Sequence, residues 1–209
     1  KIKEYVYKLD NIFQKYYKKC YKNSKKYYKE LYNIYDFEDY QIIGASPESL
    51  VSVKDGIVTT NPIAGTRPRG NDDEEDQRLA ADLSTDTKEV AEHRMLVDLG
   101  RNDIGRIAQI GTVEVTKYME VEYFRYVMHL TSIVKGQLLE NLTVLDALKA
   151  TLPAGTVSGA PKIRAMQRIY ELEKEKRGIY AGAIGYLSAT GDMDFAIAIR
   201  TMVVKNGKA

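Results

Sequence analysis

Short stretches in which apolar residues alternate with polar ones, or follow one another directly, predict a series of β-strands. They lie at residues 40–44, 50–53, 57–60, 113–121, 126–134, 180–188 and 194–204. Asp55-Gly56 separates the second stretch from the third, and this dipeptide is typical of a tight turn between antiparallel strands. Thr190-Gly191-Asp192 marks a similar turn near the end of the chain. The pattern therefore predicts antiparallel hairpins.

Apolar residues three and four positions apart predict three helices between these strands. The longest begins at Asp86, three residues before Glu89 as in a capping box, and runs to about residue 107. Shorter helices are expected at residues 142–152 and 161–174, the second opened by a proline whose missing N–H costs nothing there. The acidic residues 72–76 are typical of a solvated loop or a helix start. Helices mixed with hairpin-linked strands predict an α+β fold with antiparallel sheet.

The first forty residues differ in composition from the rest of the chain. They contain ten of the sixteen tyrosines and ten lysines. Such a segment could bind nucleic acid, because bases stack on aromatic rings and phosphates pair with lysines. A solvated, lysine-rich helix explains the same residues, and we favour that interpretation. We therefore divide the chain into a divergent Lys/Tyr-rich segment, residues 1–38, and a domain, residues 39–209.

Composition and charge exclude several classes of protein. The 209 residues carry a net charge of +2, so no excess of positive charge points to a nucleic-acid partner. The single cysteine, Cys20, cannot form an internal disulfide, which fits a reducing compartment. Because the sequence has no apolar run of about 18 residues and no signal-peptide core, we expect a cytoplasmic protein without a membrane partner. Asn206-Gly207 is a hairpin signal with no returning strand, and the chain starts at Lys1, so we expect a piece of a longer chain.

Two segments could hold a metal ion or an anion. Glu89 and Glu92 share one face of the long predicted helix, and paired carboxylates suit Mg²⁺, although the same spacing is common on surface helices. Residues 151–162 place small residues, hydroxyls and two glycines directly before a helix N-terminus. This arrangement is found in anion sites and in plain interhelical loops alike.

Further candidate residues follow the strands. Gly65 and Thr66, with arginines at 67 and 69, suit close approach to a ligand that bears a carboxylate. His129 lies in an apolar stretch and is either structural or a base near neutral pH. Arg200 lies among apolar residues, so we expect a buried cation with an anionic partner. Together these residues indicate a Mg²⁺-dependent site for a small polyanion, without specifying a reaction.

Seven motifs, in the same order along the chain, resemble those of the chorismate-utilising enzymes. They are residues 44–48 (GASPE), 62–70 (PIAGTRPRG), 88–93 (KEVAEH), 95–103 (MLVDLGRND), 127–130 (VMHL), 153–162 (PAGTVSGAPK) and 196–204 (AIAIRTMVV). The resemblance extends from about residue 39 to the end of the chain. Within the family, the order and spacing are most similar to the large subunits of anthranilate synthases. The resemblance implies a two-layered α+β fold, with chorismate and Mg²⁺ in a cleft between large antiparallel sheets.

The resemblance also implies a role for each matching residue. Glu48 corresponds to the general acid that protonates the leaving ring hydroxyl, and His129 to the base that takes the ring proton as pyruvate is eliminated. Glu92 corresponds to a Mg²⁺ ligand, with Glu89 close by. Five residues correspond to positions that hold the substrate and its carboxylates: Gly65, Thr66, Thr156, Tyr180 and Arg200.

Two positions separate the activities within the family. Ala64 stands where para-aminobenzoate synthases commonly carry a lysine nucleophile, and Gln14 stands where isochorismate and salicylate synthases carry a lysine that activates water. The resemblance therefore implies an anthranilate synthase of tryptophan biosynthesis, which uses chorismate and ammonia from a glutamine amidotransferase partner. Another chorismate-using activity (aminodeoxychorismate, isochorismate or salicylate synthase) is the alternative, as is an inactive truncated piece.

The chain also departs from the family pattern. Residues 15–34 replace the segment that belongs to the tryptophan feedback site. A glycine-rich strand and a further Mg²⁺-binding glutamate of the family would lie beyond Ala209. We therefore expect little activity from the 209 residues by themselves.

Overall fold

The computed structural model describes residues 33–46, 48–206 and 208–209. These residues form two compact units, which are described separately. The smaller unit combines residues 33–46 with residues 199–209, and the larger is Glu48–Ala198. Our predictions for the Lys/Tyr-rich segment and for Gln14 fall outside the described residues, and the boundary after residue 38 stays a prediction.

The smaller unit is a three-stranded antiparallel sheet. Strands β1 (Asn33–Asp36), β2 (Tyr40–Gly44) and β10 (Thr201–Lys205) lie in the order β1-β2-β10. Gly44 lies opposite Thr201, and a Cβ on Gly44 would come within 2.8 Å of the Thr201 hydroxyl. A glycine at this position therefore allows β2 and β10 to pair closely.

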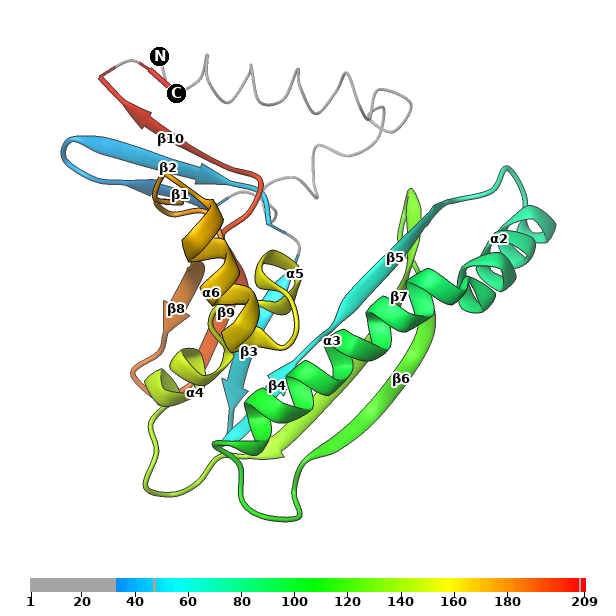
Figure 1. Cartoon of the computed structure of the whole chain (residues 1–209), viewed down its shortest axis with the longest axis horizontal. Helices are drawn as coiled ribbons and strands as arrows, with labels where there is room; N and C mark the ends of the chain where they lie inside the picture. Colours follow the sequence, from blue (N-terminus) through cyan, green and yellow to red (C-terminus); the bar gives the residue numbers. More distant parts are fainter. Residues whose placement is uncertain (1–32, 47, 207) are drawn as a thin grey trace. The chain divides into compact units, whose positions relative to one another are not determined.

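The larger unit is built on a seven-stranded antiparallel sheet (Figure 1). Its strands are β3 (Ser49–Lys54), β4 (Ile57–Thr60), β5 (Ile63–Pro68), β6 (Glu114–Tyr123), β7 (Val127–Gln137), β8 (Ala183–Leu187) and β9 (Met193–Ile197). The order is β5-β7-β4-β3-β9-β8, and β6 pairs with β7. The long strand β7 thus pairs with three others, so its residues, among them His129, are held at fixed register.

Five helices complete the larger unit. They are α2 (Asp73–Thr85), α3 (Thr87–Gly105), α4 (Val144–Thr151), α5 (Gly155–Ser158) and α6 (Lys162–Leu172). The long helix α3 lies lengthwise along strands β5 and β7 (Figure 1). Leu83 of α2 packs with Met128 and Leu130 of β7 in a buried apolar cluster. None of the helices in this described part of the chain is both long and apolar enough to span a bilayer.

The predicted α+β class and several local signals are confirmed. Asp86 caps α3, and its side chain accepts hydrogen bonds from the backbone N–H groups of Lys88 and Glu89. Asp55 and Gly56 both have positive φ angles, 51° and 76°, and they join β3 to β4. This is the geometry that an Asp-Gly hairpin requires.

Two sequence predictions are wrong in detail. The predicted strand at residues 194–204 is two strands, because β9 pairs with β3 and β8 in the larger sheet whereas β10 pairs with β2 in the smaller one. Arg200 lies in this break with a φ of 50°. Its side chain is exposed, not buried as its apolar neighbours suggested. The alternation of apolar and polar residues could not show this change of sheet, because it repeats every two residues in both strands.

Candidate active site

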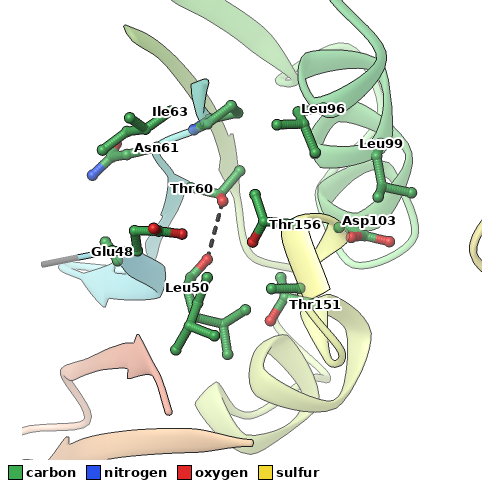
Figure 2. Close-up of a pocket in the computed structure, with 16 residues that line it drawn as sticks. Glu48, Leu50, Thr60, Asn61, Ile63, Leu96, Leu99, Asp103, Thr151 and Thr156 are labelled. Atoms are coloured by element: carbon green, nitrogen blue, oxygen red, sulfur yellow. Dashed lines mark hydrogen bonds between the residues drawn. The ribbon is translucent and has the colours of Figure 1, made fainter. Parts of the chain in front are cut away.

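A pocket opens in the larger unit beside helix α3 (Figure 2). Glu48, directly before β3, lies on one side, and Thr156 of α5 lies on another. The remaining walls come from the β4–β5 junction and from α3, and they include Thr60, Asn61, Leu99 and Asp103. The pocket therefore combines an apolar helix face with carboxylate, hydroxyl and amide groups.

Backbone contacts fix the two sides of this pocket. The carbonyl of Glu48 accepts a hydrogen bond of 2.9 Å from the N–H of Ile197. On the other side, a Cβ at Gly155 would come within 2.6 Å of Leu99 and 3.0 Å of Leu96. A glycine therefore lets α5 lie directly against α3. The small residues of the 151–162 segment thus serve close packing, which brings Thr156 to the pocket.

A second group of residues lies where β5 pairs with β7; we call Gly65, Thr66, Glu89 and His129 the Gly65 cluster. Gly65 has a φ of 71° and sits in a bulge, at which the register between β5 and β7 shifts. His129 Nδ1 lies 2.8 Å from the carbonyl oxygen of Gly65 and 3.1 Å from Thr66 Oγ1. A carbonyl only accepts, so this contact assigns the ring proton of neutral His129 to Nδ1. Nε2 then carries a lone pair that can accept a proton.

Glu89 completes the Gly65 cluster from helix α3. A Cβ on Gly65 would lie 3.3 Å from Glu89 Oε2, so the carboxylate lies directly over the bulge. Glu92 follows on the same helix and is exposed. Within the described part of the chain, neither carboxylate has a hydrogen-bond or ion-pair partner, and no group of three potential metal ligands is found. Two such carboxylates fit the usual protein share of a Mg²⁺ shell, in which water and substrate oxygens supply the rest.

The pocket and the Gly65 cluster follow one another along the same two elements. On β5, Ile63 lines the pocket and Gly65 comes two residues later, about 7 Å away at the usual rise of a strand. On α3, Glu89 precedes the pocket residue Leu96 by seven positions, about 10 Å along the helix.

The structure brings six of the nine predicted site residues to these two places and puts Glu92 on the connecting helix. Tyr180 is exposed and lies beside Arg177, whose guanidinium carbon is 5.5 Å from the ring centre, in a groove next to α6. Arg200 belongs to the smaller unit. The roles of Tyr180 and Arg200 therefore rest on the resemblance.

The two arginines of the 62–70 segment are paired within the protein. Arg67 donates to Asp82 at 2.6 Å and to Asp86 at 2.9 Å, and Arg69 donates to Asp76 at 2.8 Å through Nε. The pKa of Asp76 is lowered, first by its hydrogen bonds from Arg69. The expectation that these arginines meet a ligand carboxylate is therefore wrong, because they tie β5 to α2 and to the start of α3.

Sequence reasoning missed two buried polar groups next to the site. His93 of α3 is 0% exposed, and its Nε2 lies 2.7 Å from the hydroxyl of Ser132 on β7. Burial lowers the pKa of His93 to about 4. Lys162 donates to Asp103 at 2.6 Å in a second buried contact. The signal for His93 was its spacing from Leu96, Val97 and Gly100, which are all buried positions of the same helix face.

Replacing Gly65 with Ala is expected to destabilise the larger unit. The new Cβ would come within 2.8 Å of Leu83 Cδ1, and alanine would have to adopt a positive φ. Strain and overpacking together are expected to cost about 2 to 4 kcal/mol. Urea unfolding measures this loss. Gly105→Ala is the matched control, because nothing lies within 4 Å of a Cβ there, and its free energy of unfolding should be unchanged or slightly raised. Equal stability of the two variants would contradict the expected strain.

This chain is similar to several known proteins. Anthranilate synthase component 1 of Lactococcus lactis is 63% identical over 174 residues, which are 83% of this chain and 38% of that protein. Its counterpart from Pseudomonas aeruginosa is 60% identical over 83% of this chain and 35% of its own length. The crystal structure of anthranilate synthase component I from Streptococcus pneumoniae TIGR4 is 76% identical, with a TM-score of 0.77 over 85% of this chain and 39% of that one.

More distant structures share the fold. The menaquinone-specific isochorismate synthase MenF of Escherichia coli is 28% identical, with a TM-score of 0.69 over 80% of this chain and 38% of that one. This chain thus spans 35% to 39% of the lengths of the relatives named here. The model of the family described as chorismate binding enzyme matches residues 8–209. The chain therefore belongs to the chorismate-binding enzyme family.

Proposed function

We propose that the protein containing this chain is the large subunit of an anthranilate synthase and converts chorismate and ammonia to anthranilate and pyruvate. The observation that carries this proposal is the 76% identity to anthranilate synthase component I of Streptococcus pneumoniae over 85% of this chain. The isochorismate synthase MenF is much less similar, at 28% identity. Tryptophan biosynthesis is the pathway in which such a subunit acts, and a cytoplasmic location is part of the proposal.

The geometry supports complementary roles for Glu48 and His129. Glu48 lines the pocket, where its carboxyl group donates a proton to the ring hydroxyl as that group leaves as water. The Nδ1–H of His129 donates to the Gly65 carbonyl oxygen, so its Nε2 can accept the ring proton when pyruvate is eliminated. The hydroxyls of Thr66 and Thr156 and the backbone at Gly65 position the substrate between these two groups.

Glu89 and Glu92 would hold Mg²⁺ in this proposal. Their carboxylate oxygens are of the kind that Mg²⁺ binds, and they have no protein partner among the described residues. When bound, the ion would orient the substrate carboxylate and withdraw negative charge from the ring. The absence of a side chain at Gly65 keeps the space above the bulge open for Glu89, because a Cβ there would lie 3.3 Å from the carboxylate oxygen Oε2.

Ala64 supports ammonia as the nucleophile. Its side chain is a buried methyl group on β5, directly before Gly65, and a methyl group cannot attack the substrate ring. Ammonia in its neutral form is itself a nucleophile and needs no lysine at this position. A glutamine amidotransferase subunit is the partner that would supply it.

The proposal is tested with the chain expressed together with all of the coding sequence that flanks it in its gene. Chorismate, Mg²⁺ and an ammonium salt should yield fluorescent anthranilate and pyruvate in equal amounts. Removal of Mg²⁺ by a chelator should abolish the product, and readdition should restore it. Formation of isochorismate or an aminodeoxychorismate would assign another activity of the same family. No turnover of chorismate at all would favour an inactive polypeptide.

A further inference from the structure

Lys162, the first residue of α6, holds a buried position beside the pocket. Its side chain is 9% exposed, and its ammonium group donates to Asp103 Oδ2 at 2.6 Å and to the carbonyl oxygen of Thr151 at 2.9 Å. Asp103 is also buried, and its other carboxylate oxygen accepts from Arg106 at 3.1 Å. Both oxygens of the carboxylate and two of the three ammonium protons are therefore used within the protein.

These contacts close the segment between α4 and α6 into a loop. Thr151 is the last residue of α4, and Lys162 follows eleven positions later. One ammonium group thus joins the two ends of residues 152–161 and ties both to Asp103 of α3. Arg106 adds a hydrogen bond to the carbonyl of Ala150, which fastens the end of α4 to the same helix. The loop is closed at its base by charge and hydrogen bonds, not by apolar packing alone.

Thr156 lies in the middle of this closed loop. It lines the pocket together with Thr151 and Asp103, as Figure 2 shows. Gly155 packs on Leu99 of α3, so a shift of the loop base away from Asp103 would also carry α5 away from the helix. The position of the Thr156 hydroxyl therefore depends on the contact between Lys162 and Asp103, which can act without touching a ligand.

We propose that Lys162 is a positioning residue, which closes residues 152–161 onto Asp103 and thereby holds Thr156 at the pocket for substrate binding. Lys162 does not contact the substrate; it acts through Thr156. The part of this inference that concerns substrate rests on the proposed function, whereas the part that concerns the loop does not.

Hydrogen exchange tests the loop directly, in the 209-residue chain and without substrate. Lys162→Met keeps the length and apolar stem of the side chain but removes the ammonium group. We expect the amides of residue 152 and of residues 154–160 to exchange about tenfold faster in this variant, with no change in the β3–β4 hairpin. Lys149→Met is the matched control, because the Lys149 side chain is 76% exposed and pairs with Asp146 on its own helix. Unchanged exchange of residue 152 and of residues 154–160 in Lys162→Met would overturn the proposal.

Kinetics with chorismate test the link to Thr156 in the complete protein. Lys162→Met should raise KM about tenfold and change kcat by less than about threefold, which is the signature of lost binding. Thr156→Val should raise KM as well, and adding Lys162→Met to it should have little further effect, because both changes remove the same contact. Fully multiplicative effects on KM would show that Lys162 does not act through Thr156. Lys162→Arg, which keeps a buried cation and several donors, should recover most of the affinity.

The two tests separate this inference from the proposed function. If chorismate is not a substrate, the proposed function fails, and the exchange measurement still decides whether Lys162 holds the loop. If chorismate is turned over but KM does not change while exchange accelerates, the loop contact exists and its role in binding is refuted. Should Lys162→Met fail to fold, the pair Asp103→Asn with Lys162→Met removes both charges and leaves no unpaired buried ion. The same acceleration of exchange is expected there, and its absence would refute the proposal.

Discussion

Glu48→Gln and His129→Ala are each expected to lower the turnover of chorismate about 10²-fold or more, with the fold intact. Glutamine is nearly isosteric with glutamate but has no acidic proton to give to the leaving hydroxyl. Alanine at position 129 removes the ring whose Nδ1 lies 2.8 Å from the Gly65 carbonyl, and with it the lone pair on Nε2. Stopped assays of anthranilate and pyruvate in the complete protein measure both losses.

Glu140→Gln is the matched control for the loss of one carboxylate. Glu140 is exposed in the connection between β7 and α4 and does not line the pocket. Its replacement should leave turnover unchanged within about twofold. Wild-type rates in Glu48→Gln would refute the role of Glu48 as the acid. Wild-type rates in His129→Ala would likewise refute its role as the base.

The free energy of unfolding should fall by about 3 kcal/mol between pH 7 and pH 4 because of His93 alone. Burial lowers the pKa of His93 from 6.5 to about 4 in the folded protein. Between these two values the unfolded chain binds a proton that the folded protein does not, so stability decreases as the pH falls. The contribution is complete above pH 6.5 and is lost as the pH approaches 4. A proton on both ring nitrogens would also leave an N–H at Nδ1, which has no partner in the described structure.

His93→Gln isolates this contribution from the titration of carboxylates elsewhere. The glutamine amide can still bond to the Ser132 hydroxyl but does not titrate in this range. Urea unfolding of both proteins at several pH values should show the wild type losing about 3 kcal/mol more than the variant from pH 7 to pH 4. Parallel pH profiles would show that the folded protein accommodates the imidazolium, which would contradict a folded-state pKa of about 4.

The local signals in the sequence predicted the elements of the fold better than their pairing. The capping residue Asp86 and the Asp55-Gly56 turn act within a few residues, and both were recognised. The split of residues 194–204 between β9 and β10 depends on which strands lie alongside, and a two-residue period carries no information on partners. Helix α2 was seen only as an acidic run, because its stability depends on burying Ala80 and Leu83 against β7.

In the site, too, local motifs were easier to predict than contacts between distant residues. The motifs resembling the family gave Glu48, Thr156 and the Gly65 cluster, and the structure brings these together in two adjacent places. The partners of Arg67 and Arg69 were missed because an arginine in a sequence does not show which of several nearby aspartates it will meet. The role of Lys162 could not be predicted from the sequence, because its contact with Asp103 spans 59 positions along the chain.

Helix α3 also constrains how this protein can change over evolution. Glu89 and Glu92 stand near its beginning, and Asp103 stands near its end, with the pocket residues Leu96 and Leu99 between them. One inserted residue would turn everything after it by about 100° and shift it by about 1.5 Å. The carboxylates that we propose as Mg²⁺ ligands, Glu89 and Glu92, and the carboxylate of Asp103 would then no longer share one face of the helix. Variation within α3 should therefore proceed by substitution, whereas insertions should accumulate in the connections after it, such as residues 138–143 before α4.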